Sequence, residues 1–376
     1  MAARPVARTS VRSAARSTTR GSRPSDRARP AVRDYTGSTP PVAVEWDVRV
    51  VYDFLFSLSK DAGSTDDVPA ADREWLATAR SSLTPEIRTD MEDLLHSEVA
   101  IHAAPFVVEH PEISSVDDLI GALDVVPTAD LMRSMLSDFR RDPKTGALID
   151  LCATGDPGAV EELTDAMPEH NGALRELLSD PVESHHRILR VLTAWAKPYR
   201  QIEARVLSIL ERDLAMRTDD KSASDVSDLI ERTTGGIRWL PEMGISRVIL
   251  APSYFTRPFN FLFAGEDWRF YGYPVSDDAV DAGDRLSPPP AVIRLHRALG
   301  DETRLRILKL LAGRDLYLTE IAQQLDLSKP TIKHHLAMLR AAGLLTVTES
   351  STVVYYSLRT DRIQGAAGDL ESFLRT

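Results

Sequence analysis

Residues 328–345 read SKPTIKHHLAMLRAAGLL, and this stretch decides how the last quarter of the chain folds. Ile332, Leu336 and Leu339 recur at spacings of four and three residues, which is typical of a helix with one buried stripe. A serine precedes the first turn as an N-cap, and a glycine follows the last turn as a stop signal. The stretch therefore predicts one amphipathic helix from residue 329 to about residue 342.

The segments on both sides of this helix add further helices and strands in the order of a known fold. We expect a first helix through Val292, Leu295 and Leu299, a second from Asp301 to Gly313, a third around 321–325, and strands at 345–348 and 353–358. Two helices joined by a three-residue connection and followed by a hairpin make a winged helix-turn-helix. We therefore predict that residues 291–376 bind DNA, the alternative being a small helical domain with a solvated polar face.

The geometry of the long helix selects the side chains that could read DNA. A turn of about 100° per residue places His334 opposite the apolar stripe, and the N-terminal half of a recognition helix reaches base edges. Thr331, Lys333 and His334 are the predicted base readers, Lys329 is placed for a phosphate, and Ser328 caps the helix. The candidate DNA contacts are Ser328, Lys329, Thr331, Lys333, His334 and Arg340.

Four segments of this region resemble the ArsR/SmtB family of transcription regulators. They are LGDETRLRIL at 299–308, SKPTIKHHL at 328–336, LRAAGLL at 339–345 and YYSL at 355–358. The resemblance implies a homodimer that binds double-stranded operator DNA and usually represses until an effector releases it. It also implies a dimer interface made by the first and last helices, at about 291–299 and 362–374.

The positions at which members of this family sense metals lack their ligands. Residues 315–320 read DLYLTE, without the thiols of thiolate sensors, and the last helix has no histidine. The single cysteine, Cys152, cannot build a multi-thiolate site and is expected to be a small buried residue. The adjacent His185 and His186 point about 100° apart on a helix. We predict no metal site and no cofactor.

The rest of the 376-residue chain divides by composition. Residues 1–40 hold nine arginines and almost no large apolar groups, which predicts a disordered basic tail. An upstream extension through a wrongly chosen start codon is an alternative, and the arginines also imitate a transit peptide. Residues 277–290 are acidic, end in three prolines and are predicted to be a linker.

Between these segments we expect a module of mainly α with small β structure. Residues 41–244 show a helical pattern almost throughout, with starts at Thr84-Pro85 and Asp180-Pro181 and a kink at Pro198 in a long helix. Residues 245–276 are rich in β-branched and aromatic residues, which predicts two or three strands packed on the helices, among the stretches 246–251, 259–263 and 268–273. The segment 247–253 also resembles large N-terminal modules of some actinobacterial family members. This resemblance does not imply any particular ligand.

Charge is divided unequally along the chain, whose net charge is −11. The net charge is +7 for residues 1–40, −21 for residues 41–290 and +3 for residues 291–376. Because an acidic surface repels polyanions, any contact with nucleic acid is expected at the ends of the chain.

Together these patterns predict a transcription regulator, most simply a repressor, and not an enzyme. A small-molecule enzyme or a protein-interaction module fused to a regulatory DNA-binding domain remains the alternative. The middle module is expected to bind an effector or to serve as a dimerisation platform. Aromatic residues suggest a possible effector pocket at Tyr254, Phe261 and Trp268. No run of 18 apolar residues occurs, so we expect a cytoplasmic protein without a membrane partner.

Overall fold

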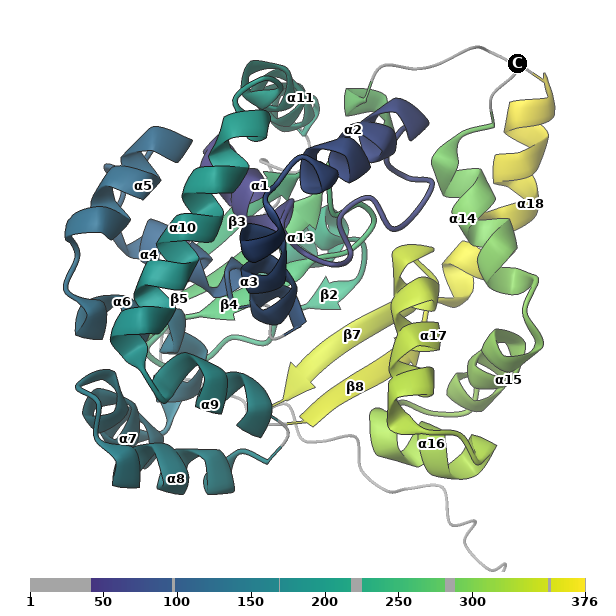
Figure 1. Cartoon of the computed structure of the whole chain (residues 1–376). Coiled ribbons are helices and arrows are strands. Elements are labelled where there is room, and N and C mark those ends of the chain that lie inside the picture. Colours follow the sequence, from purple (N-terminus) through teal and green to yellow (C-terminus); the bar gives the residue numbers. More distant parts are fainter. Residues whose placement is uncertain are drawn as a thin grey trace, which may run out of the picture. The chain divides into compact units, whose positions relative to one another are not determined.

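The computed structural model describes residues 42–96, 99–168, 170–217, 225–280, 288–350 and 353–375. Within these ranges the chain is mainly helical and contains two four-stranded sheets, which confirms the predicted fold class (Figure 1). The predicted disordered tail of residues 1–40 lies outside the described residues. We call the described part of residues 42–280 the middle module and that of residues 288–375 the C-terminal domain.

The elements of the middle module are as follows. Its strands are β1 (Ala43–Trp46), β2 (Ile237–Arg238), β3 (Arg247–Ser253), β4 (Phe261–Ala264) and β5 (Trp268–Pro274). Its α-helices are α1 (Val50–Phe56), α2 (Ala70–Ser81), α3 (Pro85–His96), α4 (Ala104–Glu109), α5 (Val116–Val125), α6 (Thr128–Met135), α7 (Pro143–Ala153), α8 (Pro157–Ala166), α9 (Asn171–Leu178), α10 (Pro181–Tyr199), α11 (Glu203–Met216) and α13 (Val226–Thr234). Short 3-10 helices are η1 (Ile101–Ala103), η2 (Ser137–Arg141) and η3 (Asp277–Ala279).

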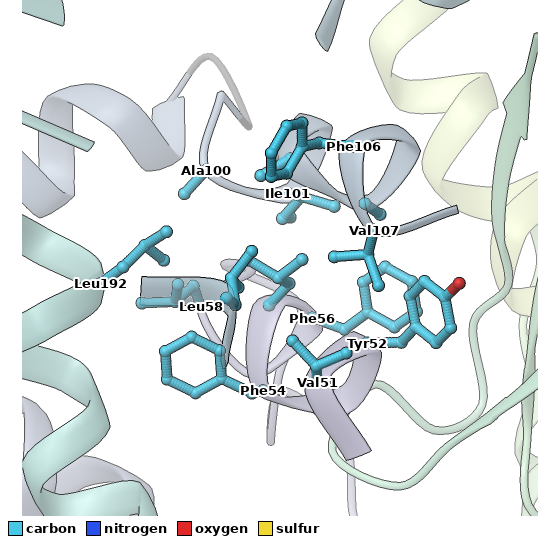
Figure 2. Packing of buried hydrophobic residues seen from close by; sticks show 14 of the residues in the cluster. Val51, Tyr52, Phe54, Phe56, Leu58, Ala100, Ile101, Phe106, Val107 and Leu192 are labelled. Atoms are coloured by element: carbon cyan, nitrogen blue, oxygen red, sulfur yellow. The ribbon is translucent and has the colours of Figure 1, made fainter. Parts of the chain in front are cut away.

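Helix α1 forms the centre of the middle module, because all seven of its residues are buried. A helix that is apolar on every side needs neighbours on every side. Figure 2 shows Phe54 and Phe56 of α1 among side chains such as Ile101, Phe106 and Leu192, which come from separate helical segments. The module is thus built around one short helix.

Asp53 is the one charged residue of α1, and its side chain is fully buried. Its Oδ1 accepts hydrogen bonds from Ser253 Oγ at 3.0 Å and from the backbone nitrogens of Tyr254 at 2.6 Å and Phe255 at 3.3 Å. Its Oδ2 accepts from Tyr199 Oη at 3.2 Å. This carboxylate therefore connects α1 to the end of β3 and to the end of α10.

The first sheet has the order β1-β3-β5-β4, in which β4 is antiparallel to β5 and the other pairs are parallel. Alternate residues of β3 point to opposite faces. Ile249 and Ala251 join the core around α1, whereas Val248 and Leu250 pack with residues of α13. Strands β3 and β5 are thus buried on both faces, by the core around α1 on one side and by a smaller cluster with α13 on the other.

The predicted strands of the 245–276 segment are confirmed as β3, β4 and β5; the bounds of β3 and β4 differ by one or two residues, and β5 begins at the predicted residue and is one residue longer. Both predicted helix starts are confirmed as well. The backbone nitrogen of Ile87 donates to Thr84 Oγ1 at 3.4 Å, and that of Glu183 donates to Asp180 Oδ1 at 3.0 Å.

Three details of the predicted helical segment 41–244 are wrong, and one of them is strand β2 (Ile237–Arg238), which pairs with β7 (Leu345–Ser350). Ala43–Trp46 forms strand β1, because it finds a parallel partner in β3 about two hundred residues later, which local periodicity does not reveal. The predicted kinked helix is instead two helices, α10 and α11. Pro198 cannot donate to the preceding turn, and α10 ends one residue later.

The C-terminal domain follows the predicted order closely. Its elements are α14 (Pro290–Leu299), α15 (Glu302–Leu311), β6 (Leu316–Tyr317), α16 (Leu318–Leu325), α17 (Lys329–Ala341), β7 (Leu345–Ser350), β8 (Val353–Leu358) and α18 (Thr360–Arg375). Side chains from all four predicted helices form one core of their own. Strand β6, which pairs with β8, was not predicted.

The second sheet joins the two parts of the chain, with the order β2-β7-β8-β6. Strand β2 of the middle module runs parallel to β7 of the C-terminal domain, with Ile237 opposite Val347. The backbone nitrogen of Val347 donates to the carbonyl oxygen of Gly236 at 2.7 Å, and Thr346 Oγ1 donates to Glu231 Oε1 at 3.2 Å. The wing of the domain is therefore extended by a strand from the module.

Side chains of α14 form a second connection between the two parts. Arg294 pairs with Asp67 and, at 3.3 Å between Nη2 and Oδ2, with Asp277. Arg297 pairs with Asp66 at 2.9 Å between Nη2 and Oδ2. The predicted linker of residues 277–290 begins with η3 and ends where α14 starts, and its residues 281–287 lie outside the described part.

Replacing Gly236 with alanine is expected to separate β2 from β7. Gly236 has φ +134°, and a Cβ there would lie 2.5 Å from the carbonyl oxygen of Leu345. Such strain costs about 1–3 kcal/mol, so the amide of Val347 should exchange its hydrogen about tenfold faster or more. Gly121→Ala is the matched control, because a Cβ there meets nothing within 4 Å. Unchanged exchange at Val347 in Gly236→Ala would contradict the pairing.

Candidate DNA-binding interface

Helix α17 has the N-terminus that its sequence predicts. Ser328 Oγ accepts a hydrogen bond from the backbone nitrogen of Thr331 at 3.3 Å, and the two hydroxyl oxygens lie 2.8 Å apart. Ile332, Leu336 and Leu339 are buried in the core of the C-terminal domain, as the spacing predicts. The opposite face of α17 is therefore directed away from that core.

The turn before α17 is set by Asp326, which adopts the left-handed conformation with φ 54°. A non-glycine residue rarely takes this conformation, and aspartate is among those that tolerate it. It ends α16, and the backbone nitrogen of Leu327 donates to the carbonyl oxygen of Ala322 at 3.1 Å. This tight connection gives the two helices the arrangement of a helix-turn-helix.

The predicted contact residues fall into two groups. Ser328, Lys329, Thr331, Lys333 and His334 are exposed and belong to the cap and the first half of α17. Arg340 is half-buried in the last turn, 11 residues after Lys329, which corresponds to about 16 Å along a helix. The structure thus brings five of the six candidates together on one exposed end of the helix, and Arg340 lies at the other end.

His335 differs from its neighbour His334 because it faces inward. Its Nδ1 lies 3.8 Å from Asp301 Oδ1, the carboxylate that caps α15. Burial lowers the pKa of His335 below its usual value, even though the Asp301 carboxylate favours the charged form. His335 therefore lies beside the N-cap of α15, where its Nδ1 has no hydrogen-bond partner among the described residues, and His334 is the histidine exposed to a ligand.

Comparison with known proteins identifies the family to which the C-terminal domain belongs. Residues 301–347 match the model of the bacterial regulatory proteins of the arsR family. The transcriptional repressor SdpR of Bacillus subtilis is 36% identical over 78 residues, which are 21% of this chain and 87% of SdpR. The chain belongs to the ArsR family. The matched ArsR-family region contains α15, α16, α17 and the start of β7.

Other relatives match the same small share of the chain. The regulator KmtR of Mycobacterium tuberculosis is 33% identical over 73 residues, 19% of this chain and 56% of KmtR. The transcriptional activator HlyU of Vibrio cholerae is 34% identical over 74 residues, 20% of this chain and 68% of HlyU. These similarities cover about a fifth of the chain, the share that the ArsR-family domain occupies.

Ionisable groups that could hold a metal are not clustered in the part of the chain that the structure describes. Cys152 is fully buried in α7, as predicted, and burial raises the pKa of its thiol to about 11. The thiol is therefore protonated near neutral pH and is a poor nucleophile or metal ligand. In the described ranges, no helix is long and apolar enough to cross a membrane.

The aromatic residues proposed for an effector pocket all belong to the core of the middle module, where each makes different contacts. Tyr254 donates its hydroxyl to Asp72, and its ring lies under the Arg205 guanidinium. The ring of Phe261 stacks on that of Phe56 with 4.5 Å between centroids. Trp268 lies at the opposite end of the paired strands β3 and β5 from Tyr254. In the described structure these side chains make packing contacts in the core, and the effector pocket stays a prediction.

Proposed function

We propose that this chain is a sequence-specific transcription regulator whose C-terminal domain reads an operator through α17 and whose middle module controls that binding. The observation that carries this proposal is the exposure of Lys329, Thr331, Lys333 and His334 in the presence of the middle module. The module contacts the domain elsewhere, through β7 and α14. A major groove can therefore approach the first half of α17.

The distribution of charge also favours DNA binding by the C-terminal domain over DNA binding by the middle module. Residues 291–376 carry a balance of +3 and residues 41–290 a balance of −21. DNA phosphates are attracted to the positive net charge of residues 291–376 and repelled by the negative net charge of residues 41–290. We assign no catalytic step to the middle module, and its role in this proposal is regulation.

We propose further that the protein acts as a homodimer and a repressor. Helices α14 and α18 pack on each other, and Ile293 and Leu374 on them are exposed apolar side chains, with 36% and 72% of their surface accessible. Burying such side chains against a second copy is favourable. SdpR is a repressor by name and HlyU an activator; repression is preferred because the similarity spans a larger share of SdpR.

A footprinting experiment with the full chain tests this function. The probe is the DNA upstream of the chain's own gene, with random DNA of equal length as the control. We expect a protected site bound about a thousandfold more tightly than random DNA. Its affinity should fall steeply as salt rises, because phosphate neutralisation releases counterions. Equal affinity for both DNAs would overturn sequence-specific regulation.

A further inference from the structure

A cavity of about 320 Å³ lies where the middle module meets the C-terminal domain. The module contributes the C-terminal end of α13, the segment between β3 and β4, and the end of β5. The domain contributes the start of α14, the end of α17 and residues after β8. A cavity of this size accommodates a small metabolite.

The lining of this cavity is dominated by arginine. The module contributes Arg217, Arg232 and Arg257. The domain contributes Arg294, Arg340, Arg359 and Arg362. Among the described lining residues, Asp277 is the one carboxylate. Residues 41–290 have a net charge of −21, so the composition of this segment does not predict a cluster of arginines at its surface.

Three of these arginines are only weakly neutralised, and all three belong to the C-terminal domain. The nearest ion pairs of Arg359 and Arg362, with Asp361 and Asp369, have N–O distances of 3.7 Å. No carboxylate of the described residues lies within ion-pair distance of Arg340. Burial lowers the pKa of the Arg340 guanidinium, since nothing compensates its desolvation fully.

Polar groups without partners provide an independent observation. The side-chain oxygens of Thr233, Asn260 and Ser276 are buried and have no hydrogen-bond partner, and all three residues line the cavity. The hydroxyls of Thr233 and Ser276 can donate to an oxyanion, and the oxygen of Asn260 can accept from a ligand hydroxyl. Buried polar groups are normally paired, so three unpaired oxygens in residues around one cavity mark a polar site whose hydrogen bonds the described residues do not complete.

The helix dipole explains part of the arginine cluster but not the whole. Arg232 and Arg340 lie in the last turns of α13 and α17, where a positive charge complements the helix end. Arg257, Arg359 and Arg362 do not lie at such ends. Arginine presents a planar set of donors that matches phosphate and carboxylate groups.

We propose that this cavity binds a small anion carrying two or more negative charges on phosphate or carboxylate groups, and that the bound anion lowers the affinity for the operator. The anion would be held by arginines of both parts and would fix the acidic module against the domain. It would also neutralise positive charge that attracts DNA. The effect on the operator rests on the proposed function, whereas the binding of the anion does not.

Calorimetry of the full chain tests the site directly. Pyrophosphate and citrate are titrated in separate arms, which distinguish phosphate from carboxylate ligands, against sodium chloride of equal ionic strength. We expect saturable binding of one of them, weakened about tenfold or more by Arg340→Gln and by Arg359→Gln. Arg375→Gln is the matched control, because Arg375 is exposed and lies outside the cavity. Thermal unfolding checks that each variant remains folded.

Operator binding is then measured with and without the anion that binds. We expect the anion to weaken operator binding about fivefold or more, and Arg359→Gln to abolish this change. Failure of both anions to bind, or equal weakening by Arg375→Gln, would overturn the site. Binding without any change in operator affinity would overturn the regulatory half while leaving the site. Absence of any specific operator would count against the proposed function alone.

Discussion

Replacing Lys333 and His334 together with alanine is expected to weaken operator binding about a hundredfold. Both side chains are exposed on the first half of α17. A lysine can donate to the acceptors of guanine, and a histidine can donate to a base acceptor. Each contact with a base is worth about 1–3 kcal/mol, so the loss of both reaches this magnitude. Titration of a labelled operator duplex with the full chain measures the effect.

The control for this experiment removes the same two kinds of side chain from the middle module. Lys144 and His186 are exposed and lie on α7 and α10. The variant Lys144→Ala/His186→Ala should bind the operator as the wild type does. The α17 variant should lose less affinity for random DNA than for the operator. Equal losses on both DNAs would show that Lys333 and His334 do not read bases.

Replacing Asp53 with alanine is expected to destabilise the middle module by about 3–5 kcal/mol. The substitution removes a fully buried acceptor and leaves four donors without it, on Tyr199, Ser253, Tyr254 and Phe255. The midpoint of chemical denaturation of the full chain, followed by tryptophan fluorescence, measures the loss. Asp124→Ala on the exposed side of α5 is the control, with an expected change within about 0.5 kcal/mol.

The pH dependence of stability gives a second signature of Asp53. Burial raises the pKa of Asp53, outweighing the hydrogen bonds that lower it. The folded state then holds the proton more tightly than the unfolded state, so stability falls as pH rises from the usual aspartate pKa to the raised one. Asp53→Asn should lack this fall. A variant with the pH profile of the wild type would contradict the assignment.

The sequence predicts the C-terminal domain well because its signals are local. The cap at Ser328, the spacing of Ile332, Leu336 and Leu339, and the ArsR-family segments all lie within short stretches. The exposed face of α17 follows from the same spacing by helical geometry. The base-reading roles of Lys333 and His334 still rest on that geometry and stay predictions.

Features that depend on distant partners could not be predicted in this way. Strand β1 exists because β3 lies beside it, and β2 exists because β7 does. A strand of two residues such as Ile237–Arg238 has no periodicity to detect. The arginines of the cavity come from segments as distant as Arg217 and Arg362, and only the tertiary structure brings them together.

The pairing of β2 with β7 has a consequence for shortened forms of the protein. A fragment that begins at α14 lacks β2, so the backbone groups of β7 near Val347 lose the strand that covers them. An uncovered strand edge is a template for pairing with another chain. Such fragments are expected to associate edge to edge through β7. Their oligomers would then form through the strand edge that β2 covers in the intact chain.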